Sequence, residues 1–199
     1  MLKKWRTLDS KLVFDTGWFK VLQETCETHS GRVIDDYFVI QSDDVAIIFA
    51  LTPDNQVVLV RQYKQGIRDI ITEIPAGGIN AGEDPEVGAR RELREETGYS
   101  AAEFVLVSTH LRSPTNRATK DYIFFARDVY LAGPPQFDDN ENVETQLVSL
   151  ETLRQMIKTG EISDIGCLSA IYRVLDYLEL LGPVASSQPN SSNSPRPAD

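Results

Sequence analysis

The sequence predicts an α+β domain built on a mixed sheet, and three observations lead to this class. Short apolar or alternating segments typical of strands lie both before and after one central helix at residues 84–97. Helices do not separate successive strands regularly, as they do in a doubly wound parallel sheet. The chain has 199 residues, 41% of them hydrophobic, which is enough for one continuous core.

The N-terminal segment predicts a β extension of the main domain. Trp18–Thr28 and Arg32–Ile40 are extended-looking segments separated by a His-Ser-Gly turn at residues 29–31, which indicates a hairpin. We therefore treat residues 1–40 as an N-terminal β-hairpin extension and residues 41–182 as the main domain.

The strands expected next form the first half of the main domain. Val45–Leu51 is a nearly continuous apolar run rich in β-branched residues, which is typical of a buried strand. Pro53–Asn55 is a turn, because Pro fixes φ and the Asp and Asn side chains bond locally. Val57–Tyr63 and Asp69–Ile74 are then expected as two further strands.

The central helix has recognisable ends. Asp84 is a good N-cap and Pro85 suits the first turn. Gly98 fits the position after the last turn, so the helix is expected to end at Thr97. The segment Pro75–Gly78, just before it, contains two glycines that permit positive φ and predicts a loop.

Beyond the helix, Phe104–His110, Asp121–Leu131 and Glu144–Ser149 are expected as strands. Leu150–Thr159 and Gly166–Leu181 are expected as helices, the second because its apolar residues recur at helical spacing.

The last residues of the chain, 183–199, are mostly Ser, Pro, Asn and Ala and have no periodic apolar positions. Burial of such a segment cannot offset the entropy lost on ordering it. We therefore expect a disordered tail outside the fold.

The charge of the chain limits its partners. The formal net charge is -10, so polyanions are repelled at long range and broad nucleic-acid binding is disfavoured. A small anionic substrate remains compatible if a cation lies between it and the protein. No apolar run approaches the roughly 20 residues of a membrane span, so no membrane partner is expected.

The cysteines and the N-terminus indicate a cytoplasmic protein. Cys26 and Cys167 are too far apart in sequence to give metal spacing or a disulfide framework, so free thiols are expected. The first residues include two lysines but no apolar region of the kind that a signal peptide has.

Three glutamates on the central helix carry the predicted chemistry. Glu92, Glu95 and Glu96 are related by i, i+3 and i+4 and share one face, where their charges repel. A divalent cation relieves that repulsion, and oxygen ligands suit Mg²⁺ or Mn²⁺. Arg91, four residues before Glu95, is expected to hold that side chain. The alternative is a solvated charged helix, but the helix has few apolar anchors for so polar an element.

The spacing of residues 77–99 resembles a known motif. Gly77, Glu83, Arg91–Glu92, Glu95–Glu96 and Gly98 match the Nudix box, Gly-x5-Glu-x7-Arg-Glu-U-x-Glu-Glu-x-Gly-U, where U is apolar. Every fixed position is present, and the one soft departure is an aromatic residue in the last apolar place. The resemblance implies the Nudix α/β/α sandwich and metal-dependent hydrolysis of a nucleoside diphosphate linked to another moiety X.

The resemblance also implies roles for individual residues. Glu92 and Glu96 would bind Mg²⁺ (or Mn²⁺) with the Ala76 carbonyl, and Glu95 would be a further ligand or an outer group. Arg91 would orient Glu95. Glu83 would have a structural or outer role.

A general base is also needed, and the acidic loop at residues 137–144 supplies two candidates. By resemblance to ADP-ribose pyrophosphatases, which carry a catalytic glutamate on a mobile loop here, Glu141 is the first candidate and Glu144 the second. The alternative for this loop is a solvated acidic segment.

Features outside the box resemble the ADP-ribose pyrophosphatase group. The approach Glu73–Gly78 and Pro114, fifteen positions after Tyr99, are similar to markers of that group. The extension resembles a segment exchanged between subunits, which implies a homodimer in which Phe19 stacks on adenine or is simply a core or interface aromatic. Further substrate contacts implied or considered are those of Arg61, Lys64, Glu73, Arg112 and Pro114. Lys64 stands where Arg is commoner, and Arg112 is alternatively a plain surface arginine.

The leading function is therefore hydrolysis of ADP-ribose to AMP and ribose 5-phosphate. The nearest rival is a related nucleotide-sugar pyrophosphatase, for example one acting on GDP-mannose. A non-catalytic nucleotide-binding regulator is disfavoured because no box glutamate is lost. RNA decapping is disfavoured by the acidic balance and the lack of a basic stripe.

Overall fold

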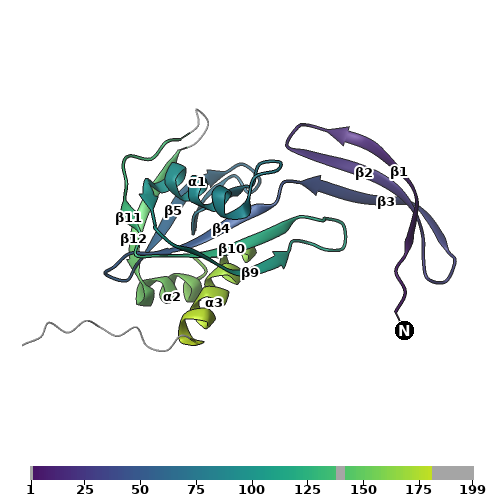
Figure 1. Ribbon diagram of the computed structural model, residues 1–199. Coiled ribbons are helices and arrows are strands. Elements are labelled where there is room, and N and C mark those ends of the chain that lie inside the picture. The colour runs from purple at the N-terminus through teal and green to yellow at the C-terminus, as the bar shows by residue number, and fades with distance from the viewer. Residues whose placement is uncertain (1, 138–141, 181–199) are drawn as a thin grey trace, which may run out of the picture.

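The computed structural model describes residues 2–137 and 142–180 (Figure 1). Its main domain is a mixed sheet covered on one face by α1 (Pro85–Thr97) and on the other by α2 (Leu150–Thr159) and α3 (Ile165–Leu180). A separate small sheet projects from this domain at the N-terminal end. The predicted α+β sandwich with a mixed sheet is confirmed. No helix in the described part of the chain is long and apolar enough to cross a membrane.

The main sheet has seven strands, and its central pair is parallel. Five strands form a continuous path, in the order β12 (Val143–Ser149), β5 (Gln56–Lys64), β4 (Val45–Leu51), β10 (Lys120–Arg127) and β9 (Phe104–Leu111). Two short strands lie off this path: β6 (Asp69–Glu73) pairs with β5, and β7 (Ala76–Gly78) pairs with β4. The β4–β10 pair is parallel and the other pairs are antiparallel.

The strand β4 divides the core into two layers. Successive side chains of a strand point to opposite faces, so alternate residues enter different layers. The odd-numbered residues join the cluster under α2 and α3, whereas the even-numbered ones join the cluster under α1. In order along the strand, the two sets are Ile47, Phe49 and Leu51, and Ala46, Ile48 and Ala50. Nearly all of β4 is therefore buried, as its continuous apolar sequence predicts.

The ends of α1 are those that the sequence predicts. The Asp84 side chain accepts a hydrogen bond from the backbone N–H of Glu86, and Pro85 begins the helix. Gly98 has a φ of 75° and its N–H donates to the Arg94 carbonyl. A Cβ at this position would lie 2.2 Å from the Gly133 carbonyl oxygen, so only glycine is accommodated.

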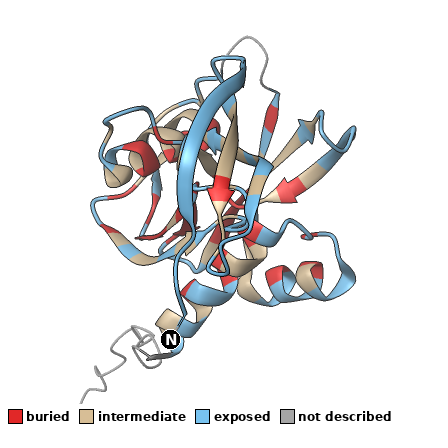
Figure 2. Ribbon diagram, turned by 90° about the vertical axis from the view of Figure 1, so that its right-hand side faces the viewer, coloured by how far each residue is buried: buried red, intermediate tan, exposed pale blue. Residues whose placement is uncertain are grey.

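The N-terminal sheet contains one strand more than the sequence predicts. The expected hairpin is formed by β2 (Phe19–Glu27) and β3 (Val33–Ser42), and β1 (Arg6–Asp15) pairs with β2. Every residue of β1 is exposed, and its register with β2 shifts twice. Because no face of β1 is buried, the alternation of apolar and polar residues that identifies a strand is not required there. Figure 2 shows how little of this small sheet is buried.

Two other segments differ from expectation. The strand expected over Asp121–Leu131 breaks at Asp128, whose φ is 53°, and continues as β11 (Tyr130–Leu131) paired with β8 (Tyr99–Ser100). The loop expected before α1 contains the short strand β7, because the glycine backbone pairs with β4. The tail expected at residues 183–199 lies outside the described residues.

Candidate active site

Arg91 is the centre of a network of carboxylates at the edge of the sheet. Its Nε and Nη2 donate to the two oxygens of Glu83 at 3.0 and 2.9 Å. Its Nη1 donates to Glu92 at 2.5 Å and to Glu95 at 3.2 Å. Its Nη2 also donates to the Gly78 carbonyl at 2.8 Å. One guanidinium therefore ties three glutamates to the strand β7, and the predicted contact between Arg91 and Glu95 is present.

The charges of this network stabilise one another. Hydrogen bonds from Arg91 lower the pKa of Glu83 from its ordinary value of 4.5 to about 2. The bond to Glu83 raises the pKa of Arg91 further above its usual range, with smaller contributions from Glu92 and Glu95. Glu83 thus remains ionised. It binds Nε and Nη2 of Arg91, whereas Glu95 binds Nη1. This geometry agrees with the structural role that the resemblance implies for Glu83.

Gly77 brings the backbone of β7 against the side chain of Glu92. A Cβ built on Gly77 would lie 2.1 Å from the carboxyl carbon of Glu92, far closer than any real contact. A side chain at this position would push the Glu92 carboxylate, the flexible end of that side chain, away from β7. Glu92 is held between that backbone and the guanidinium of Arg91.

Glu96 is fixed to the same strand. It is 6% exposed, and its Oε2 accepts a hydrogen bond from the backbone N–H of Ala76 at 3.1 Å. The N–H of Ile48 donates to the Pro75 carbonyl, so the neighbouring pair Ile47–Ala76 is a non-hydrogen-bonded one. Both backbone groups of Ala76 therefore point away from β4. The Ala76 carbonyl faces the side of the strand on which Glu96 lies.

These groups match the donors that a hard divalent cation requires. They are two carboxylates, Glu92 and Glu96, and one backbone carbonyl, that of Ala76, all of them oxygen donors on adjoining elements. The described residues include no group of three metal-ligating side chains already gathered together. Mg²⁺ does not need one, because it keeps several waters and takes only one or two carboxylates. Glu95, whose side chain is 41% exposed, lies at the rim of this set.

A cavity of about 390 Å³ opens beside β7. It brings together four of the residues predicted from the sequence, Lys64, Glu73, Ala76 and Arg112. Its apolar wall comes from Val45, Ile47, Ile67, Ile71 and Ile74. A mostly apolar cleft with a few convergent polar groups is typical of a small-molecule site.

Glu73 is the least satisfied polar group in this cavity. Its carboxylate forms an ion pair with Lys64 at 3.4 Å. Among the described residues, the buried Oε2 has no partner in hydrogen-bond geometry. Burial raises the pKa of Glu73 although Lys64 lowers it. An acceptor left in this state is available to a ligand hydroxyl or amino group.

Two titratable residues that line the cavity were not predicted as site residues from the sequence. Asp164 caps α3 through a hydrogen bond from the N–H of Cys167 at 2.8 Å. The Cys167 thiol accepts the N–H of Ile74, and burial raises the pKa of the thiol to about 12. Cys167 lies 93 positions after Ile74, and a pattern of local spacing cannot reveal such a neighbour.

Other predicted residues lie away from the cavity. Arg61 pairs with Glu144 at 3.3 Å across β5 and β12, and the two side chains are 40% and 71% exposed. Phe19 lies in the N-terminal sheet, with its ring centroid 5.7 Å from that of Phe14. Pro114 lies in an exposed turn after β9. Glu141 lies outside the described residues.

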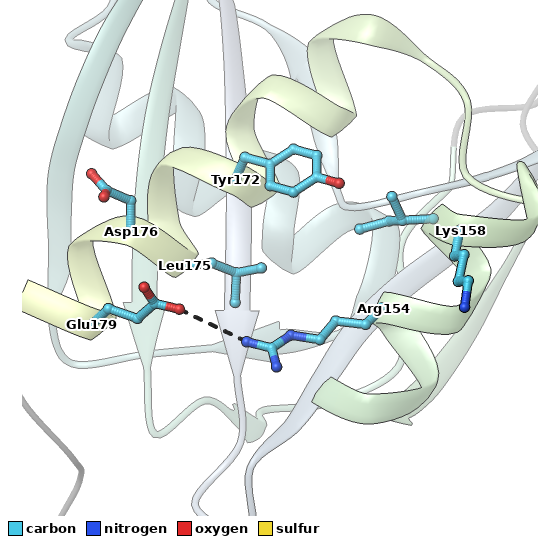
Figure 3. Close-up of a pocket in the computed structure, with 7 residues that line it drawn as sticks. Arg154, Lys158, Tyr172, Leu175, Asp176 and Glu179 are labelled. Atoms are coloured by element: carbon cyan, nitrogen blue, oxygen red, sulfur yellow. Dashed lines mark ion pairs between the residues drawn. The ribbon is translucent and has the colours of Figure 1, made fainter.

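A second hollow lies between α2 and α3, on the far face of the sheet from α1 (Figure 3). Its volume is about 570 Å³, and Arg154 and Glu179 approach each other across its rim at 3.9 Å. Figure 3 shows that Tyr172 and Leu175 come from α3 and Lys158 from α2. None of the residues predicted to be functional lines this hollow.

The family of the chain follows from comparison with known proteins. The NUDIX domain family matches residues 41–168, and the family described as nucleoside diphosphate sugar hydrolase N-terminal domain matches residues 5–40. The chain therefore belongs to the Nudix family of hydrolases. The membership predicted from residues 77–99 is confirmed.

Two curated relatives are similar over most of their length. The ADP-ribose pyrophosphatase of Bacillus subtilis (strain 168) is 29% identical over 88% of this chain and 92% of its own. The methanol dehydrogenase activator of Bacillus methanolicus is 30% identical over the same shares of the two chains. Among solved structures, one described as an ADP compounds hydrolase superposes with a TM-score of 0.82 at 22% identity. That superposition covers 92% of this chain and 99% of the other, and it shows a common fold.

Proposed function

We propose that this hydrolase cleaves the diphosphate linkage of ADP-ribose to give AMP and ribose 5-phosphate. The observation that carries the proposal is the contact of Glu96 with Ala76 beside a cavity lined by Lys64, Glu73 and Arg112. This contact joins the glutamates of α1 to a pocket with the size and polarity of a small-molecule site. The similarity to an ADP-ribose pyrophosphatase over 88% of the chain supports this choice of substrate.

Glu92, Glu96 and the Ala76 carbonyl would hold a divalent ion, for which Mg²⁺ is proposed and Mn²⁺ is an alternative. The ion, when bound, supplies charge neutralisation for the diphosphate and favours deprotonation of the attacking water. Arg91 keeps Glu92 and Glu95 in place, and Glu83 keeps Arg91 in place. The protein thus contributes positioning, which is the main requirement in phosphoryl chemistry.

The reaction needs one base and one water. The water oxygen bonds to one phosphorus, the bond from that phosphorus to the bridging oxygen breaks, and the base takes the proton. We assign the base to Glu141, with Glu144 as the second candidate. Glu144 lies on β12 and is paired with Arg61 of β5, so its carboxylate already has a partner. Lys64 and Glu73 would contact the substrate from the cavity wall.

The N-terminal extension supports a homodimer as the working form. Large apolar side chains stand exposed on this small sheet, including Trp5 at 47%, Phe14 at 51%, Trp18 at 85% and Phe38 at 48%. Exposed apolar area of this extent marks an interaction surface. A second copy of the chain is the proposed partner, and Phe19 would then face the substrate of either copy. Buried free thiols at Cys26 and Cys167 support a reducing, cytoplasmic location.

The proposal is tested by hydrolysis of a substrate panel with Mg²⁺ and with a chelator. The panel contains ADP-ribose, GDP-mannose, NADH, a diadenosine polyphosphate and a capped nucleotide. We expect ADP-ribose to be cleaved fastest and the chelator to stop the reaction. Faster cleavage of GDP-mannose would overturn the substrate assignment and keep the chemistry. Cleavage of none of them would favour a nucleotide-binding regulator.

A further inference from the structure

Arg112 forms part of a wall between two cavities. It lines the 390 Å³ cavity beside β7 and also a neighbouring cavity of about 740 Å³, and Asp164 is the other residue of that shared wall. The larger cavity lies between the end of β9, the turn at residues 113–117 and the beginning of α3. A side chain in this wall can therefore contact a ligand in either of the two cavities.

A buried carboxylate determines where Arg112 lies. Arg112 Nε donates to Asp121 Oδ1 at 2.9 Å and to Oδ2 at 3.2 Å. The Asp121 side chain is 7% exposed, whereas that of Arg112 is 37% exposed. Asp121 is itself fixed by the sheet, because it is paired with Val45 on one side and His110 on the other.

Within residues 2–137 and 142–180, the hydrogen bonds of the Arg112 side chain are made by Nε and not by the terminal nitrogens. In the common bidentate pair, a carboxylate takes two nitrogens of the arginine. Here both oxygens of Asp121 contact Nε alone, and a guanidinium carries four more N–H groups on its terminal nitrogens. Nη2 lies 3.2 Å from the place where a Cβ on Gly166 would be, so the glycine gives it room beside α3.

We propose that Asp121 is a positioning residue that holds Arg112 by Nε so that its terminal nitrogens bind an oxyanion of the substrate at this wall. The inference rests on the proposed function. Arg112 contacts the substrate, and Asp121 acts only through Arg112. A buried ion pair is costly to form, and a surface arginine without a function would not need one.

The test is a double-mutant cycle with Arg112→Met, Asp121→Asn and both together, read as KM and kcat for ADP-ribose. Loss of a charge-assisted hydrogen bond is expected to raise KM roughly ten- to a hundred-fold in Arg112→Met, with kcat little changed. Asp121→Asn is expected to raise KM less. In the Arg112→Met background it is expected to raise KM no further. A purely structural Asp121 would raise KM by the same factor in both backgrounds, and that result would overturn the proposal.

Arg112→Lys gives a result even where Asp121→Asn does not fold. A lysine keeps the charge, but its single nitrogen, when held at Asp121, cannot also lie where the terminal nitrogens of the arginine lie, so KM is expected to rise nearly as in Arg112→Met. A wild-type KM in Arg112→Lys would overturn the proposal. Asp176→Asn is the matched control, because it removes the partner of Arg173 in an exposed pair at 2.8 Å.

Failure of the proposed function is distinguishable from failure of this inference. If the wild-type chain does not cleave ADP-ribose, the same cycle is read as the Kd of ADP-ribose with Ca²⁺, measured by calorimetry. If Asp121→Asn weakens binding in the wild-type background but not in the Arg112→Met background, the positioning role of Asp121 is supported even though the proposed function has failed. Equal losses in both backgrounds would overturn it.

Discussion

The backbone N–H of Ala76 donates to Oε2 of Glu96 over 3.1 Å, and this bond joins β7 to α1. The bond sets the distance between β7, which contains the Ala76 carbonyl, and α1, which contains the Glu92 and Glu96 carboxylates. Glu96 is nearly buried, so its position is determined by packing as well as by this bond. The relationship makes Glu96 the residue on which the proposed metal site depends most.

Glu96→Gln is expected to lower turnover more than about 100-fold, because outer partners of metal ligands already account for about 10- to 100-fold. The amide keeps the shape of the side chain, so the fold is expected to persist. Initial rates with ADP-ribose and Mg²⁺, together with circular dichroism, measure both effects. Glu86→Gln on the same helix, where Glu86 pairs with Arg90 in a half-exposed position, is the control. Full activity in Glu96→Gln would remove Glu96 from the metal site.

Gly77→Ala is expected to lower activity, because the new methyl group would push the flexible Glu92 carboxylate out of its place beside β7. Gly78→Ala is an unusually close control, since a Cβ there meets nothing within 4 Å. The free energy of unfolding of Gly78→Ala is expected to differ from that of the wild type by less than about 0.5 kcal/mol. Initial rates with ADP-ribose measure the difference in activity, and urea denaturation checks that both variants remain folded. Equal activity of the two variants would show that the Glu92 carboxylate is not needed against the backbone of residue 77.

Glu83→Gln is expected to change how stability depends on pH. The folded-state pKa of Glu83 is about 2, below its ordinary value of 4.5, so its ionisation stabilises the fold above pH 4.5. This contribution falls as pH decreases from 4.5 to 2. Loss of charged hydrogen bonds to Arg91 is expected to lower the free energy of unfolding at pH 7 by roughly 1–3 kcal/mol. The difference between wild type and variant is expected to shrink over that acid range. A constant difference would contradict the assignment.

Glu141→Gln is expected to lower kcat much more than it raises KM, since a general base acts on the reacting water and not on binding. Steady-state kinetics over a pH range separates the two constants. Glu144→Gln serves as its counterpart, because it removes the partner of Arg61 and leaves Glu141 unchanged. An unaltered kcat in Glu141→Gln, with a loss in Glu144→Gln, would transfer the base role to Glu144.

Trp18→Ser combined with Phe38→Ser is expected to weaken the proposed homodimer, since both side chains are exposed on the N-terminal sheet. Sedimentation velocity over a range of concentrations measures the change. Tyr172→Ser removes another exposed aromatic side chain between α2 and α3, and it is the control. A wild-type chain that sediments as a monomer at all concentrations would contradict the dimer.

The sequence predicted helices and strands best where a single local signal, such as a continuous apolar run or a capping residue, marked the element. The buried strand β4 and the helices α1 and α2 were found with their bounds correct, because apolar continuity and capping residues mark them. The strand β1 was missed because it packs against nothing that imposes alternation. The break at Asp128 was missed because a positive φ in a residue other than glycine has no strong local signal.

The candidate site was predictable in part for the same reason. The contact of Arg91 with Glu95 was predicted from helical spacing, whereas the bonds of Arg91 to Glu83, eight residues earlier in the loop before the helix, were not. The ion pair of Arg112 with Asp121 was not predicted, because it joins the residue after β9 to β10 through an antiparallel register that only the folded sheet defines. Cys167 was missed for a similar reason, since α3 meets Ile74, the residue after β6, only in the tertiary structure.

The register of β4 has a consequence for how activity is lost. Its first residues pair with β7 on one edge, where Ile47 faces Ala76, and with β10 on the other, where Val45 faces Asp121. The carbonyl proposed for the metal and the carboxylate that holds Arg112 are thus aligned by the same short stretch of backbone. A slip of one residue would displace both at once. Catalytic competence and global structure should therefore disappear together along a denaturant titration, and a rate assay then serves as a measure of folding.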